Sequence, residues 1–126
     1  MRKIDLLIID GHADVRTLLA RRLNAHPRFR VVAHTGNPLL GTELAWLWEP
    51  DIILIDPKGA GLYGSETYRR IARASPSSRL VVFTSYLLEG ERRTFLKAGF
   101  SNCLLKGMGL KALAEELYRL MPPALV

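Results

Sequence analysis

Short apolar runs alternate along this chain with stretches in which apolar residues recur every three or four positions. The runs LLII at 6–9 and IILI at 52–55 are typical of strands buried on both faces of a parallel sheet. The stretch that follows the first run carries Val15, Leu18 and Leu19 at the spacing of one helix face. The pattern therefore predicts strands and amphipathic helices in turn.

The whole chain can be divided in this way, with element ends uncertain by about 2 residues. The strands are expected at residues 4–9, 30–34, 51–55, 79–84 and 102–105, and the helices at 13–25, 38–48, 64–74, 89–98 and 109–121. Strict alternation implies a parallel sheet with right-handed crossovers and helices on both faces. Since the 126 residues contain no linker or repeat, we expect a single α/β domain spanning 1–126.

An aspartate directly follows each of the two aliphatic runs, Asp10 after the first and Asp56 after the second. In open α/β sheets, ligands bind at the carboxyl ends of the strands, where the strand order reverses. Two carboxylates on neighbouring strands would form an anionic pocket there. Such a pocket can hold a hard divalent cation or present one carboxylate as a nucleophile.

The composition of the chain limits the class of protein and the cellular compartment to which it can belong. Hydrophobic residues make up 48% and charged residues 24%, as in ordinary globular domains. No apolar stretch approaches the roughly 20 residues that span a bilayer, and the N-terminal run is too short for a secretory signal. Cys103 is the single cysteine, so no internal disulfide can form. We therefore expect a cytoplasmic protein without membrane contact.

The net charge of +6 raises the question of nucleic-acid binding. The basic residues are spread along the chain, and no run of them is interleaved with aromatic residues. We therefore expect a solvated basic surface and no direct nucleic-acid binding by this chain.

Four short segments carry polar residues at the ends of the predicted strands. They read IIDGHADVR at 8–16, PDIILID at 50–56 followed by PKGAGLYG, VVFTS at 81–85 and NCLLKG at 102–107. In this order and at these spacings they resemble the receiver domains of two-component response regulators. The spellings D-x-H-x-x-V-R and LLKG are most similar to receivers that often carry a helix-turn-helix output domain.

The resemblance implies a flavodoxin-like sheet with strand order 2-1-3-4-5 and a signalling role without enzymatic activity. By motif position, Asp56 would accept a phosphoryl group from a histidine kinase or phosphotransfer protein. Asp10, Asp56 and the backbone carbonyl of Lys58 would hold Mg²⁺. Thr84 would donate a hydrogen bond to a phosphoryl oxygen, and Lys106 would pair with the phosphate as a point charge.

Several positions depart from the family pattern. Gly11 stands where a second acidic metal ligand is usual, so we expect weak Mg²⁺ binding. His12 is a poor ligand for Mg²⁺ and is interpreted as a surface loop residue. Pro57 removes a backbone N–H that helps to hold the phosphoryl group in the family. Cys103 replaces an aromatic switch residue and is interpreted as a small buried hydrophobe, and the loop at 59–61 reads GAG without the usual proline.

Three functions remain open at this point. Asp56 could accept phosphate, or the chain could be a pseudo-receiver that acts as a docking or dimerisation module without phosphorylation. A hypothesis from another class is a small nucleotide- or flavin-binding module. Against that hypothesis, the first βα loop has one glycine, and no G-x-G-x-x-G is present.

The resemblance also places the contact surface at residues 89–121, where the family forms dimers and binds partners. Because Cys103 replaces the switch aromatic, we expect a homodimer at this face to depend little on phosphorylation. The charged residues expected to take part are Glu89, Glu91, Arg92, Arg93 and Lys97.

Two expectations concern single helices. Trp46 and Trp48 are two positions apart and cannot share a helix face, so one should lie in the core and the other in solvent. Glu89 and Arg93 have the spacing of a stabilising i, i+4 pair.

Overall fold

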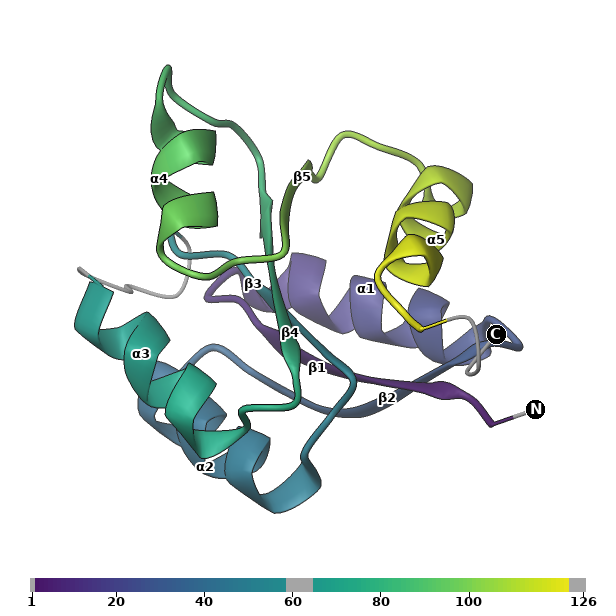
Figure 1. Cartoon of the computed structure of the whole chain (residues 1–126). Helices are drawn as coiled ribbons and strands as arrows, with labels where there is room; N and C mark the ends of the chain where they lie inside the picture. Colours follow the sequence, from purple (N-terminus) through teal and green to yellow (C-terminus); the bar gives the residue numbers. More distant parts are fainter. Residues whose placement is uncertain (1, 59–64, 123–126) are drawn as a thin grey trace.

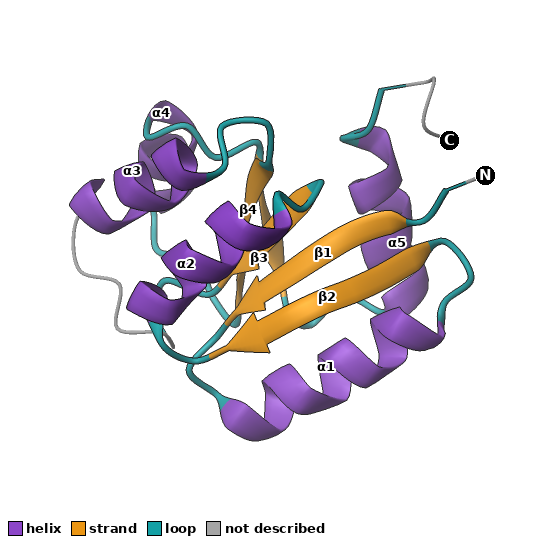
Figure 2. Ribbon diagram, turned by 90° about the horizontal axis from the view of Figure 1, so that it is seen from below, coloured by secondary structure: helices purple, strands orange, loops and turns teal. Residues whose placement is uncertain are grey.

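Five parallel strands form one sheet in the order β2-β1-β3-β4-β5 (Figures 1 and 2). The structure, a computed structural model, describes residues 2–58 and 65–122. The strands are β1 (Ile4–Ile9), β2 (Phe29–Thr35), β3 (Ile52–Ile55), β4 (Arg79–Thr84) and β5 (Asn102–Leu105). The predicted flavodoxin-like strand order is therefore confirmed.

A helix follows each strand. The helices are α1 (Ala13–Ala25), α2 (Pro38–Trp48), α3 (Ser65–Ala74), α4 (Glu91–Lys97) and α5 (Leu110–Arg119). The ends of all ten elements lie within two residues of the predicted ends. In the described part of the chain, no helix combines the length and apolar character needed to cross a membrane.

The strand order reverses between β1 and β3, which lie side by side at the centre of the sheet. Their register pairs Ile9 with Ile55, and the backbone N–H of Asp56 donates to the carbonyl of Ile9 at 2.9 Å. The residues that follow the two strands, Asp10 and Asp56, therefore leave the sheet as neighbours. This register is what positions the site.

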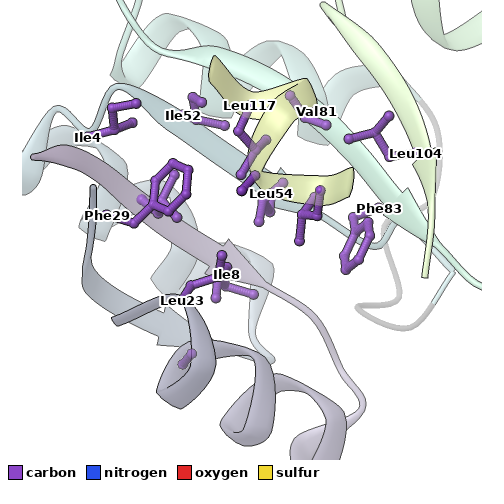
Figure 3. Close-up of a cluster of buried hydrophobic side chains, with 14 of the residues drawn as sticks. Ile4, Ile8, Leu23, Phe29, Ile52, Leu54, Val81, Phe83, Leu104 and Leu117 are labelled. Atoms are coloured by element: carbon purple, nitrogen blue, oxygen red, sulfur yellow. The ribbon is translucent and has the colours of Figure 1, made fainter. Parts of the chain in front are cut away.

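The sheet is covered on both faces, with α1 and α5 on one side and α2, α3 and α4 on the other (Figure 2). Successive residues of β1 alternate between two buried clusters, Leu6 and Ile8 facing α1 and α5, and Leu7 facing the opposite helices. Figure 3 shows the first cluster, in which Leu117 of α5 packs among side chains of the strands, including Phe29 at the start of β2. Burial in both clusters explains why the central strands β1 and β3 read as aliphatic runs.

Helix α2 buries two small residues and leaves both of its tryptophans exposed. Gly41 and Ala45 are its buried residues, whereas Trp46 and Trp48 are 69% and 47% exposed. A Cβ on Gly41 would lie 2.6 Å from the Cδ1 atom of Ile9, so the helix approaches the sheet too closely for a larger side chain. The prediction that one tryptophan lies in the core was therefore wrong.

Helix α4 begins later than predicted. Gly90 precedes it with a φ of 82°, a left-handed conformation that glycine adopts readily. Glu89 therefore lies outside the helix, and among the described ion pairs there is none between Glu89 and Arg93. The predicted i, i+4 pair was wrong because the helical spacing does not extend to Glu89.

Candidate functional site

Two buried carboxylates lie at the carboxyl ends of the central strands. Asp10 and Asp56 are each 2% exposed. The backbone N–H of Asp10 donates to the carbonyl of Thr35 at 2.9 Å, which fixes the turn after β1. A buried carboxylate is costly unless charge or hydrogen bonds compensate it, so the groups around this pair decide its chemistry.

Lys106, directly after β5, supplies the compensating charge. Its Nζ atom lies 2.6 Å from Asp10 Oδ2 and 2.7 Å from Asp56 Oδ2. Burial of the amine favours its neutral form, but the hydrogen bonds and charges of the two carboxylates outweigh this effect and raise the pKa of Lys106 above its ordinary value. The structure thus brings together three residues that the sequence singled out.

His12 is the residue of this site that the sequence reasoning missed. Its backbone N–H donates to Asp10 Oδ1 at 2.9 Å, and its ring Nδ1 lies 3.1 Å from the same oxygen. The ring nitrogen is also 3.6 Å from Asp56 Oδ2. The side chain is 55% exposed, as a surface residue should be, but one edge of the ring faces the carboxylates. The D-x-H spacing could have indicated this contact, because an aspartate side chain commonly accepts a hydrogen bond from the backbone N–H two residues further along the chain.

Lys58 contributes to the site through its backbone. Its N–H donates to Asp56 Oδ1 at 3.0 Å, so a backbone donor reaches the carboxylate although Pro57 has none. Its side chain leads away, with Nζ donating to Glu91 Oε1 at 2.8 Å and to the carbonyl of Tyr86 at 2.7 Å. The ammonium group of Lys58 holds the pKa of Glu91 below its ordinary value. The role of the Lys58 carbonyl as a metal ligand stays a prediction.

Thr84 ends β4 and is buried at this edge of the sheet, and its carbonyl accepts the backbone N–H of Lys106 at 2.8 Å. Cys103 lies fully buried in the cluster that also contains Phe95 and Phe100, and burial raises the pKa of its thiol. Its interpretation as a buried residue is confirmed. The loop at 59–61 lies outside the described residues.

The model of the response regulator receiver domain matches this sequence over residues 6–118. The chain belongs to this family. It is 35% identical over 114 residues to the nitrate/nitrite response regulator protein NarL of Escherichia coli strain K12, a match that covers 90% of this chain and 53% of that protein. It is 31% identical over 114 residues to the transcriptional regulatory protein LiaR of Bacillus subtilis strain 168, covering 90% and 54%. The receiver thus spans about half the length of these relatives.

Solved structures agree with this assignment. The response regulator domain of CheB from Thermotoga maritima superposes with a TM-score of 0.74 at 26% identity, covering 94% of this chain and 92% of that one. The signal receiver domain of NarL from Mycobacterium tuberculosis gives a TM-score of 0.83 at 19% identity and covers 94% and 96%. The predicted family is confirmed, and the nucleotide- or flavin-binding alternative is set aside.

Receiver domains typically bind Mg²⁺ at acidic residues, and the donor atoms present here fit a divalent cation. Ligating atoms of Asp10, His12 and Asp56 all lie within 4.8 Å of one another. The two carboxylates are the oxygen donors that a hard cation requires. Gly11 contributes no side-chain oxygen, so in the described part of the chain the carboxylate oxygens of this group come from Asp10 and Asp56.

Proposed function

We propose that this receiver accepts a phosphoryl group on Asp56 from a histidine kinase or phosphotransfer protein. The observation that carries the proposal is the placement of the Asp56 carboxylate beside Asp10 and 2.7 Å from the ammonium group of Lys106. An Asp56 oxygen would attack the phosphorus of a phosphohistidine as the P–N bond breaks. The bonding electrons return to the imidazole nitrogen, and Asp56 becomes an acyl phosphate.

The neighbouring residues supply what such a transfer needs. Phosphate oxygens repel an attacking carboxylate, and positive charge next to both groups lowers this repulsion. Lys106 carries one such charge, the N–H of Lys58 orients the Asp56 carboxylate, and the hydroxyl of Thr84 would donate to a phosphoryl oxygen. A bound Mg²⁺, held by Asp10, Asp56 and the Lys58 carbonyl, would supply further charge neutralisation. We propose that it binds weakly because Gly11 replaces an acidic ligand.

The response of such a domain is a change in protein–protein contact rather than turnover of a substrate, and we propose a cytoplasmic location for it. The proposed contact surface is the face of α4, β5 and α5 within 89–121. It offers the exposed apolar residues Leu96 and Leu105, and β5 is an edge strand of the sheet. Arg92 and Lys97 line a shallow open surface on α4 next to Leu96.

Phosphorylation can be tested directly on the purified chain. Incubation with acetyl phosphate and a divalent cation should add one phosphoryl group to the intact mass, and Asp56→Asn should abolish the addition. Asp14→Asn, which removes an exposed carboxylate from the first turn of α1, is the control and should keep it. An adduct that persists in Asp56→Asn would reassign the acceptor. No adduct on the wild-type chain would favour the pseudo-receiver, a docking module that is not phosphorylated.

A further inference from the structure

Besides the Lys106 ammonium group, a ring nitrogen of His12 lies next to the two carboxylates. Asp10 divides its oxygens between two neighbours, Oδ2 facing the Lys106 ammonium and Oδ1 facing His12. The Lys106 ammonium group thus contacts one oxygen of Asp10, and the other oxygen, Oδ1, faces His12. Asp56 Oδ2 is within reach of both sides, 2.7 Å from Lys106 Nζ and 3.6 Å from His12 Nδ1.

The separations on the histidine side match those of ligands that share one metal ion. An ion bound to nitrogen and oxygen at about 2.0–2.2 Å keeps adjacent ligand atoms about 3.0–3.5 Å apart. His12 Nδ1 lies 3.1 Å from Asp10 Oδ1 and 3.6 Å from Asp56 Oδ2. Little movement would therefore turn these contacts into a three-ligand set.

The histidine is held in this position by the backbone. His12 is the N-cap residue of α1, and its N–H is tied to Asp10 Oδ1, so the ring leaves the chain at a fixed point beside the site. The carboxylates are buried and the ring is 55% exposed, so among the described residues the ring lies on the solvent side of the two carboxylates. Water or a phosphoryl oxygen could complete the coordination there.

We propose that His12 Nδ1 is a metal ligand with Asp10 and Asp56, and that this receiver prefers a divalent first-row transition ion to Mg²⁺. Imidazole suits Zn²⁺, Co²⁺ and Ni²⁺, whereas Mg²⁺ takes oxygen ligands and gains little from a ring nitrogen. Gly11 stands where the family usually has a second acidic ligand, so the site offers fewer oxygen ligands to Mg²⁺. His12 offers a nitrogen ligand in addition to the remaining oxygens. The inference rests on the proposed function, because it concerns the cation of the same site.

The proposed role of His12 can be tested by measuring metal binding to the whole chain, without a phosphodonor. Zn²⁺, Co²⁺ and Mg²⁺ are titrated by calorimetry into protein stripped of metal with a chelator. The variants are His12→Asn, in which a favoured N-cap residue preserves the helix start, and His26→Asn, which removes an imidazole at the other end of α1. We expect Zn²⁺ and Co²⁺ to bind more tightly than Mg²⁺ to the wild-type chain.

His12→Asn should lower the Zn²⁺ and Co²⁺ affinities by about tenfold or more and the Mg²⁺ affinity by much less. It should also change the visible absorption of bound Co²⁺, and His26→Asn should behave as the wild type. Equal losses for all three ions, or no loss in His12→Asn, would overturn the inference. If Asp56 still accepts a phosphoryl group in that case, the proposed function stands. A His12-dependent Zn²⁺ site on a chain that takes no phosphoryl group would refute the proposed function alone.

Discussion

Gly11 stands between Asp10 and His12 and leaves the site one carboxylate short of the family pattern. Replacing it with aspartate should raise the affinity for Mg²⁺ about tenfold, or about 1.4 kcal/mol, because an added oxygen ligand binds the cation and adds negative charge. Among the described glycines only Gly90 and Gly99 have a positive φ, so the backbone at Gly11 accepts a side chain. Calorimetric titration with Mg²⁺ measures the change.

The control for this substitution is Gly11→Asn, which has the same shape without the charge. It should leave the Mg²⁺ affinity within about twofold of the wild type, since a neutral amide is a weaker ligand than a carboxylate. An equal gain in both variants would show that the side chain acts by ordering the loop. No gain in either would mean that residue 11 does not face the cation.

The site could be predicted from the sequence as far as strand ends determine it. Asp10, Asp56 and Lys106 each directly follow a strand, and the carboxyl ends of parallel strands meet at one edge. The part played by His12 could not be predicted in this way, because it depends on the turn that ties its N–H to Asp10. The contact between Lys58 and Glu91 joins a loop to the start of α4, which is distant in the sequence, so no local sequence pattern predicts it.

At the scale of elements, prediction succeeded where periodicity reflects burial. Strands β1 and β3 are buried on both faces and read as aliphatic runs, so their positions follow from the order of apolar residues in the sequence. In α2 the tryptophans do not mark the buried face, because Gly41 and Ala45 let the helix lie close to the sheet. A prediction based on residue size therefore assigned one of Trp46 and Trp48 to the core.

The close approach of α2 makes Gly41 a packing residue. Gly41→Ala should lower the free energy of unfolding by about 1 kcal/mol, because a misfit of about 1–3 kcal/mol against Ile9 exceeds the roughly 1 kcal/mol gained by removing a helical glycine. Urea denaturation followed by circular dichroism measures this. Gly107→Ala is the control, since its Cβ meets nothing within 4 Å and should not lower stability.

The double variant Gly41→Ala with Ile9→Val identifies the contact responsible. The shorter side chain removes the Cδ1 atom that lies 2.6 Å from the added Cβ, so the two changes should be less damaging together than their sum. Additive losses would place the strain elsewhere. A Gly41→Ala chain more stable than the wild type would show that Ile9 moves aside without cost.

At the scale of the whole molecule, the question is how the site communicates with the surface. Cys103 has no ring that could swing between buried and exposed positions, and it is fully enclosed in a cluster with Phe95 and Phe100. Glu91, which we expected to pair across a dimer, is bound within the chain to Lys58. The exposed face of α4 is therefore more basic than the sequence suggested, with Leu96 as its apolar centre.

From this arrangement we predict a homodimer that forms through the face of α4, β5 and α5 with little dependence on phosphorylation. Light scattering should give the same dimer fraction with and without beryllium trifluoride, a phosphoryl analogue. Leu96→Arg should weaken dimerisation about tenfold or more, because it removes an apolar contact and adds charge to a basic surface.

Leu47→Arg on α2 is the matched control, since Leu47 is 63% exposed and Leu96 is 44% exposed. It should leave the dimer unchanged, and a loss of dimer in this variant alone would move the interface to α2. A wild-type chain that is monomeric and dimerises only with the analogue would contradict the prediction in a different way. The site would then reach the surface without an aromatic switch, through contacts such as the ion pair between Lys58, two residues after Asp56, and Glu91 at the start of α4.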